Sequence, residues 1–591
     1  MHPRENTPST AVARSRAVPP SILTILSATC LLALAGAAQA QTPSDIDAAA
    51  RQAEQLQIQT RERIEQQRQR DISSGRAPTQ LDVLPPETVD RTSALCRDIE
   101  SISIEGASLL NQRAIDQLVE PYESSCMGVA EIERLLGAIT VAYMKKGYVT
   151  ARAYLPAQDL STGTLTIEVE EGQLKEIKVE DAGKDSVSTF NVLPGGTGEP
   201  LNLRDLEQAL DQINRLASNN ATMDILPGTG PGDSIVVFHN QPSRRAHLGL
   251  TYDNNGQEAT GQNQAGINLS LDNPFGLTDF VSFTHRRAHP YDTGRHSSYF
   301  NNLSYVLPLG YSTLSLNASN SEYASILDAP SGSELHTNGN SKNYSVRLDR
   351  VMWRGQGSMW TLSGSLTKKK SENYLESILL LVSSRSLTVF DLDSSFTTGL
   401  FGGALTLDAG VARGLDWFNS LEDAQGLPYW APRAQFTKFK YGAGYFYPFA
   451  LGTHRLSFST QFQGQHAQNV LYGSEQISIG SLYTVRGFAN ASLAGDHGHY
   501  VRNELSLQQP FVLPGAQVAM LRPFLGLDYG RVWNRAGDVP EGELSSASVG
   551  ASLSLGRLSL GIVHSRPISE PRFLEERAER ENTFFNLSLS I

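Results

Sequence analysis

The residues of this sequence whose chemistry is easiest to assign are its three cysteines, Cys30, Cys96 and Cys126. Two oxidised thiols form a disulfide, which persists in exported proteins and is rare in the cytosol. Whether a disulfide forms therefore depends on whether the chain is exported and on which cysteines remain after export. In an oxidising compartment we predict a disulfide between Cys96 and Cys126, and two unrelated buried thiols are the alternative.

Other residue types give no pattern that predicts catalysis. The nucleophile motif G-x-S-x-G is missing from the sequence, and its 12 histidines have no metal-ligand spacing. Asp408, Asp416 and His454, which could act as acids or bases, are scattered among predicted strands and loops. We therefore expect no enzymatic activity, no cofactor and no metal. The net charge of -12 also argues against nucleic acid, which is bound by basic surfaces.

The N-terminal residues have the pattern of an export signal. Two arginines precede an apolar run over residues 22–37, and a small-x-small cleavage site follows and ends at Ala40. The run is shorter than the roughly 20 apolar residues of a membrane anchor. A lipoprotein site at Cys30 would put most of the apolar core after the acceptor cysteine, which is the wrong order. Residues 1–40 are thus predicted to be a cleaved signal peptide, whose removal leaves the other two cysteines.

The C-terminal part, residues 244–591, alternates apolar and polar residues in segments separated by turn residues. Such strands place one face against lipid and the other against water, which is compatible with the mean hydropathy of -0.27. Short connections such as 273–279 alternate with long ones over 320–341, 414–434 and 470–497. This pattern predicts a transmembrane antiparallel β-barrel of about 16 strands, with short periplasmic turns and long outer loops. A soluble β-sandwich is the alternative, but it would not need this alternation of connections.

The region between the signal and the barrel has three parts. Residues 44–71 are rich in Ala, Gln, Glu and Arg and lack Gly and Pro, which predicts a helix. Its few apolar residues form no core-facing stripe, so it would lie in a polar, water-filled place, and a disordered leader is the alternative. A linker follows over 73–94. Residues 95–172 and 173–243 each contain a strand, a helical region and two further strands, which predicts tandem α+β modules.

Together these features resemble the outer-membrane transporters of two-partner secretion (TpsB type), the haemolysin and filamentous-haemagglutinin secretion or activation proteins. The paired cysteines and YMKKGYVTARAYLPAQDLSTGTLTIEVEEG look like a first POTRA domain, the polypeptide-transport module of that family. NVLPGGTGEPLNLRDLEQALDQINRL and ILPGTGPGDSIVV look like a second. The resemblance implies that residues 41–72 are a plug helix in the barrel pore. It also implies an outer-membrane location with the N-terminal domains in the periplasm.

Two motifs in the barrel extend the resemblance. In the sixth predicted outer loop, the family's V-R-G-[YF] motif is matched by Val485, Arg486, Gly487 and Phe488. On the thirteenth predicted strand, its F-x-x-x-D-x-G motif is matched by Phe524, Asp528 and Gly530. The resemblance implies that this loop folds back into the barrel and that Arg486 pairs with Asp528 on the inner wall. From the residues alone, Arg486 could be a solvated loop arginine, and Asp528 could contribute only to the polarity of the pore.

The resemblance implies a function in protein export. The chain would recognise one large, unfolded secreted partner of the TpsA type, of the haemolysin, adhesin or toxin class, and export it through the barrel. We expect the partner to dock on the helix at 129–146 and the strand at 148–155, because an exposed sheet edge can add an extended polypeptide. The barrel would contact outer-membrane lipid and act as a monomer. Insertion of other barrels and passive diffusion are the alternative functions, but insertases usually carry more POTRA modules and a porin needs none.

Overall fold

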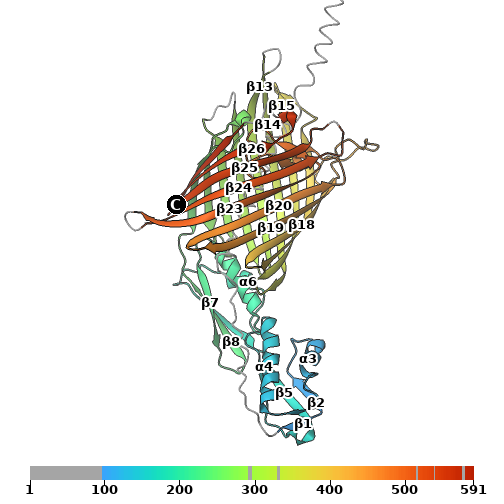
Figure 1. The fold of residues 1–591 in the computed structure, drawn as a ribbon, viewed down its shortest axis with the longest axis vertical. Helices are drawn as coiled ribbons and strands as arrows, with labels where there is room; N and C mark the ends of the chain where they lie inside the picture. Colours follow the sequence, from blue (N-terminus) through green and yellow to red (C-terminus); the bar gives the residue numbers. More distant parts are fainter. Residues whose placement is uncertain (1–95, 291–295, 329–332, 514–516, 538, 575–579) are drawn as a thin grey trace, which may run out of the picture.

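The computed structural model describes residues 96–290, 296–328, 333–513, 517–537, 539–574 and 580–591. The predicted signal peptide, plug helix and linker lie outside these residues. The described chain consists of a β-barrel and two small α+β domains that extend in line from one end of it (Figure 1). The second domain adjoins the barrel, and the first lies farther from it. No helix in the described part of the chain is long and apolar enough to span a membrane.

The first α+β domain packs helices against a three-stranded sheet. The sheet has the order β2-β5-β4, with β2 parallel and β4 antiparallel to β5. Apolar residues of the longer helix recur at helical spacing, and their buried face packs on Leu165 and Ile167 of β5. The elements of this domain are β1 (Arg97–Ile99), β2 (Ser101–Glu105), α3 (Gln112–Val119), β3 (Ser125–Met127), α4 (Val129–Lys145), β4 (Arg152–Tyr154), η1 (Leu160–Thr162) and β5 (Thr164–Glu170).

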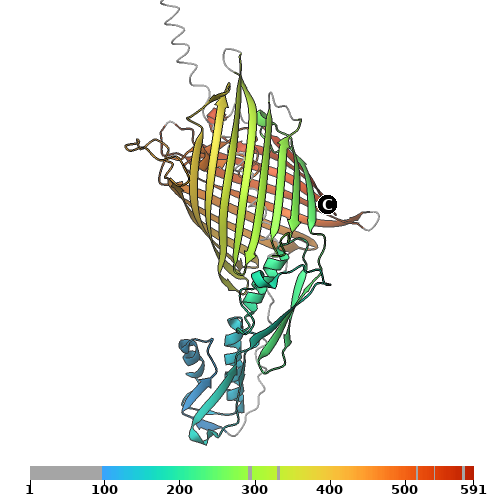
Figure 2. The same ribbon diagram turned by 180° about the vertical axis from the view of Figure 1, so that it is seen from behind.

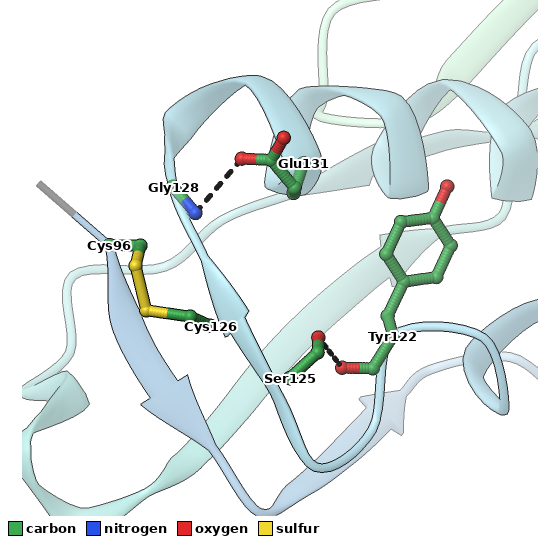
Figure 3. The surroundings of a disulfide bond; sticks show 6 residues. All are labelled: Cys96, Tyr122, Ser125, Cys126, Gly128 and Glu131. Carbon is green, nitrogen blue, oxygen red and sulfur yellow. Dashed lines mark hydrogen bonds between the residues drawn. A yellow bond between two sulfur atoms is a disulfide. The ribbon is translucent and has the colours of Figure 1, made fainter. Parts of the chain in front are cut away.

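A disulfide links the two short strands that lie outside this sheet. β1 and β3 pair antiparallel, and Cys126 of β3 is joined to Cys96, which immediately precedes β1. The Cα atoms of the two cysteines are 5.4 Å apart. Figure 3 shows the bridge next to the beginning of α4, where Glu131 accepts a hydrogen bond of 3.0 Å from the backbone N–H of Gly128. The bridge therefore fixes the start of the domain to the segment between its two helices.

A carboxylate at the end of β5 joins three parts of the first domain. Glu171 accepts hydrogen bonds from the Tyr143 hydroxyl of α4 (2.7 Å), from the backbone N–H of Leu109 (2.8 Å) and from the Ser108 hydroxyl. Burial raises the pKa of this carboxyl, but the three hydrogen bonds outweigh burial and hold its pKa below the usual value. Glu171 thus stays ionised and ties the helical layer to the sheet.

The second α+β domain is docked on the periplasmic end of the barrel through α6. Gln212 Nε2 donates to the carbonyl of Gly310 (3.0 Å), and the Tyr311 hydroxyl donates to Asp205 (2.6 Å). Burial raises the pKa of Asp205, and the hydrogen bond from Tyr311 opposes that rise. The sheet has the order β6-β8-β7, and the elements are β6 (Gln173–Glu180), α5 (Thr189–Val192), α6 (Leu203–Asn214), β7 (Ala221–Pro227) and β8 (Asp233–Asn240).

The barrel is closed by an antiparallel ladder that runs from the first strand to the last. The C-terminal strand β27 pairs with β9, with Leu587 opposite Tyr252, and Ile591 exchanges backbone hydrogen bonds with Leu248. Sixteen of the described strands form the wall, which confirms the predicted fold class. They are β9 (Ala246–Asp253), β10 (Gln264–Asp272), β11 (Phe280–Ala288), β12 (Ser297–Leu309), β13 (Ser312–Asp328), β14 (Glu334–Gly355), β15 (Ser358–Leu375), β17 (Arg385–Leu400), β18 (Gly403–Leu415), β19 (Thr437–Leu451), β20 (His454–Ala467), β23 (His497–Leu513), β24 (Gln517–Trp533), β25 (Gly542–Leu555), β26 (Leu558–Ser569) and β27 (Asn582–Ser590).

The alternating pattern of the strands separates a lipid-facing surface from the lumen. On β24, Leu525 and Leu527 are 61% and 60% exposed. Asp528, the residue after Leu527, lies on the opposite face and is buried. Figure 2 shows the tilted strands of the first half of the barrel, coloured green to yellow, from behind. Three small elements lie in the outer loops, namely η2 (Glu258–Thr260), β16 (Ile378–Leu379) and η4 (Arg572–Leu574).

The structure corrects the predicted third outer loop, 320–341. β13 continues to Asp328 and β14 already begins at Glu334, so most of that segment is a paired hairpin. The alternation is lost there because both faces of the hairpin meet water once the strands leave the lipid, while the backbone pairing continues. Smaller differences are that β4 begins at Arg152 rather than near residue 148, and that the three-residue strand β3 was not predicted.

We predict that replacing both linked cysteines with serine destabilises the first α+β domain by about 3–4 kcal/mol. A bridge that closes a loop of 30 residues removes conformational entropy from the unfolded chain. Pulse proteolysis of the full chain in urea, which reports unfolding of the N-terminal domains while the barrel stays folded, would measure the change. An unchanged midpoint for digestion within residues 96–170 would contradict the prediction.

Candidate functional site

The sixth outer loop, residues 468–496 (called L6 below), connects β20 to β23 and folds into the barrel. It contains η3 (Gly473–Glu475) and a small hairpin of β21 (Ile477–Ile479) and β22 (Leu493–Gly495). Its apolar residues Val485 and Phe488 are fully buried, in a cluster with inward-facing side chains of β23, β24 and β25. L6 is therefore a packed element of the barrel interior rather than a solvated loop.

Arg486 at the tip of L6 forms a two-point ion pair with Asp528 of β24. The guanidinium donates from Nε to Oδ2 (2.6 Å) and from Nη2 to Oδ1 (2.7 Å), and the backbone N–H of Arg486 donates to Oδ2 (3.1 Å). Arg486 is 1% exposed and Asp528 is 4% exposed. Because the planar fork of arginine matches a carboxylate, this contact fixes both the position and the orientation of the loop tip.

Glycines and an aromatic ring shape the place where Arg486 lies. A Cβ atom at Gly526 would overlap the guanidinium, and one at Gly530 would lie 2.9 Å from the Val485 side chain. The guanidinium carbon lies 5.6 Å from the centre of the Phe524 ring. Phe524, Gly526, Asp528 and Gly530 alternate along β24 and share its inward face, so the structure brings both sequence motifs together at one contact.

Further contacts of Arg486 come from β23, which the sequence did not single out. Nη1 donates to Glu504 (3.3 Å), and Nη2 donates to the carbonyl of Asn503 (3.3 Å). Glu504 also pairs with Arg522 of β24. Glu504 lies opposite Gly526 in the β23–β24 register, so finding it from sequence would have required the strand pairing as well as the motif.

A second anchor holds the base of L6 to another part of the wall. Glu475 is 2% exposed and pairs with Lys369 of β15 (2.9 Å) and Lys438 of β19 (3.1 Å). Lys438 Nζ also donates to the Glu475 carbonyl (2.8 Å), as does Gln465 Nε2 (3.0 Å). In the sixteen-stranded wall β15 is six strands from β24 and β19 is three strands from it, so the two anchors attach L6 to different parts of the wall. Sequence reasoning missed this site because no motif marks it.

The wall beside the second anchor is lined by charged side chains of both signs. Lys440 of β19 pairs with Asp391 (2.7 Å) and Asp393 (2.8 Å) of β17, and Asp393 also lies 3.5 Å from Arg347 of β14. These side chains point inward, opposite to the apolar side chains that face lipid. The lumen thus has a polar, charge-balanced wall suited to water and to polypeptide.

Among the described residues, no group of three or more His, Cys, Asp or Glu side chains could hold a metal ion. The comparison with protein families instead identifies a transporter. Residues 232–553 match the family described as haemolysin secretion/activation protein ShlB/FhaC/HecB. Residues 98–172 match the ShlB-type POTRA domain, and residues 173–227 match a POTRA domain. The chain belongs to this family. It is an outer-membrane transporter of two-partner secretion, not an enzyme, and its POTRA domains lie in the periplasm.

Individual relatives agree with the family over most of the chain. The outer membrane transporter CdiB of Escherichia coli is 34% identical over 512 residues, which cover 86% of this chain and 85% of that protein. The hemolysin transporter protein ShlB of Serratia marcescens is 33% identical, and the match covers 85% and 87% of the two chains. The solved structure of CdiB from Escherichia coli superposes with a TM-score of 0.84 at 32% identity and covers 93% of this chain and 99% of that one.

We predict that Arg486→Ala lowers the stability of L6 in its folded-in position by about 3–5 kcal/mol, because it leaves Asp528 buried without its counter-charge. Adding Asp528→Asn should restore part of the loss, so that the double variant is more stable than the sum of the single effects requires. Arg486→Lys is the matched control, since it keeps the charge but loses the fork. Heat-modifiability of the folded barrel in gels and protease cleavage within 468–496 would measure the effect. Additive single effects would show that the two residues are not coupled.

We also predict that Glu475→Gln destabilises the attachment of the base of L6 to the wall by about 3 kcal/mol or more, because Lys369 and Lys438 lose their shared carboxylate. Cleavage by added protease should rise near η3 while the Arg486 end stays protected. Glu422→Gln, which changes an exposed carboxylate of a neighbouring outer loop, is the control. Equal cleavage rates in the two variants would be evidence against an anchor at Glu475.

Proposed function

We propose that the chain exports one unfolded secreted partner protein, that its first POTRA domain receives this partner, and that the partner crosses the outer membrane through the barrel lumen. Membership of the two-partner secretion family supports a secreted protein as the cargo. The sequence contains no recognisable nucleotide-binding loop. In this proposal, folding of the partner outside the cell therefore gives the transport its direction.

The observation that carries the proposed recognition is the free edge of β4. In the described sheet β4 pairs with β5 alone, and its other side has no strand partner. Tyr154 at the end of this strand is 50% exposed, and Leu155 is 44% exposed. An extended polypeptide can pair its main chain with such an edge and place alternate side chains on the exposed apolar groups. Because β4 has three residues, the contact would be short, which suits a chain that must move on.

Passage through the lumen would require L6 to rearrange. L6 lies in the barrel interior and is bound to the wall at the Arg486–Asp528 pair and at the Glu475 cluster. In the proposal the arriving partner displaces L6 from one or both anchors. The sequence-based assignment of residues 41–72 as a plug helix is also part of the proposal and concerns residues outside the described chain.

The proposal is tested by site-specific photocrosslinking in cells that also express a candidate secreted partner of the TpsA type. A photoreactive phenylalanine at Tyr154 should capture the partner in transit. The same probe at Leu226, which is 48% exposed on the edge strand β7 of the second domain, is the matched control. We expect several-fold more partner crosslinked at Tyr154 than at Leu226, and less secretion by Arg486→Ala at equal levels of folded barrel.

Equal crosslinking at both positions would contradict recognition by the β4 edge but would leave export intact. Unchanged secretion by Arg486→Ala would show that the L6 tip has no role in transport. If the wild type secreted no partner, the export proposal itself would fail.

A further inference from the structure

A group of lysines lies on the outer face of β14 and β15, directly beyond the apolar side chains that face lipid. Lys342 of β14 is opposite Lys370 of β15 in the strand register. On the same lipid-facing side and closer to the membrane centre, the next pair is Tyr344 with Lys368, and the one after it is Val346 with Leu366. Lys342 and Lys370 are exposed, so three ammonium groups gather at the boundary between the apolar and polar parts of this face.

The position of these lysines along the strands places them at the outer surface of the membrane. Trp353, next to the periplasmic turn at the end of β14, follows Lys342 by eleven residues along the strand, or roughly 36 Å. With a strand tilt of about 40°, this distance projects to roughly 28 Å along the membrane normal. The apolar band of such barrels is about 25 Å tall. Lys342, Lys368 and Lys370 therefore lie at the level of the outer headgroups.

A groove of about 480 Å³ lies on the lipid-facing surface beneath these lysines. Apolar side chains from three neighbouring strands line it, with Lys368 and the outer-loop residue Phe418 at its rim. Lys368 Nζ donates to the carbonyl of Phe418 and to the hydroxyl of Ser420, both at 2.8 Å, and so holds this loop over the strand. The residues that form the groove include Leu316, Tyr344, Val346, Leu366, Lys368 and Phe418.

We propose that this groove is a binding site for one anionic, phosphorylated lipid of the outer leaflet. An acyl chain lies in the groove, continuous with the lipid-facing belt, and the phosphate lies against the lysine row. Glu372 pairs with Lys370 (2.7 Å), and Glu322 lies across Asn340 from Glu372. Both carboxylates lie in the next row of residues, farther from the membrane than the lysines. The lysines are therefore the charged groups nearest to the headgroup of the proposed lipid. The lipid fixes the loop that carries Phe418 against the barrel wall.

The test is native mass spectrometry of the full chain, released from detergent with bis-phosphorylated lipid A or with lipid A stripped of its phosphates. We expect the wild type to retain the phosphorylated lipid and the Lys342→Gln/Lys370→Gln variant to bind it at least about tenfold more weakly. Both lysines are exposed, so folding should be preserved, which heat-modifiability would verify. Lys175→Gln/Lys178→Gln, which removes two exposed lysines of the second α+β domain, should bind as the wild type does.

A Phe418→Ser variant separates the groove from the charges, and we expect weaker retention of the lipid with all lysines in place. Three results would overturn the proposal. These are equal binding by the Lys342→Gln/Lys370→Gln variant and the wild type, equal retention of the phosphate-free lipid, and complete displacement of the lipid by inorganic phosphate. The last result would assign the lysines to a free anion rather than to a membrane lipid.

Discussion

In the hydrocarbon of a membrane, each backbone amide or carbonyl without a partner costs several kcal/mol, and this constraint governs the structure. The antiparallel ladder has to close, and it closes where β27 pairs with β9. Closure gives every wall strand two neighbours and leaves no edge in lipid. It also fixes the direction of every side chain, since residues alternate between lipid and lumen along each strand. The polar lumen, the apolar belt and the site of L6 all follow from that alternation.

The closed wall creates a lumen into which L6 folds, and two ionic contacts hold it there. Arg486 pairs with Asp528 on β24, and Glu475 pairs with lysines on β15 and β19. Buried ion pairs contribute little net stability compared with apolar packing, but losing one partner is costly. They therefore specify one position for the loop more than they stabilise it. Under the proposed function, these contacts are the ones that must change when L6 moves.

The two periplasmic domains differ in how they are attached. Hydrogen bonds and ion pairs from α6 to the turns of the barrel wall fix the second domain, including Arg354 Nη2 to Asp211 at 2.7 Å. The first domain lies beyond it (Figure 1), and β4 is an edge strand of its sheet. The second domain is thus attached directly to the barrel, and the first domain is held at a distance from it.

The sequence by itself determined the class of fold, because alternation with period two and the contrast of short and long connections are local properties. The number of wall strands was predicted, whereas the hairpin of β13 and β14 above the lipid was not, since both of its faces meet water and no alternation remains. The pairing of Arg486 with Asp528 was expected from two sequence motifs of the family that the chain resembles. Only the tertiary structure decided that Glu504, Glu475, Lys369 and Lys438 also hold L6. These residues are far apart in the chain and carry no motif, and their charges meet only because the closed barrel brings its strands around one lumen.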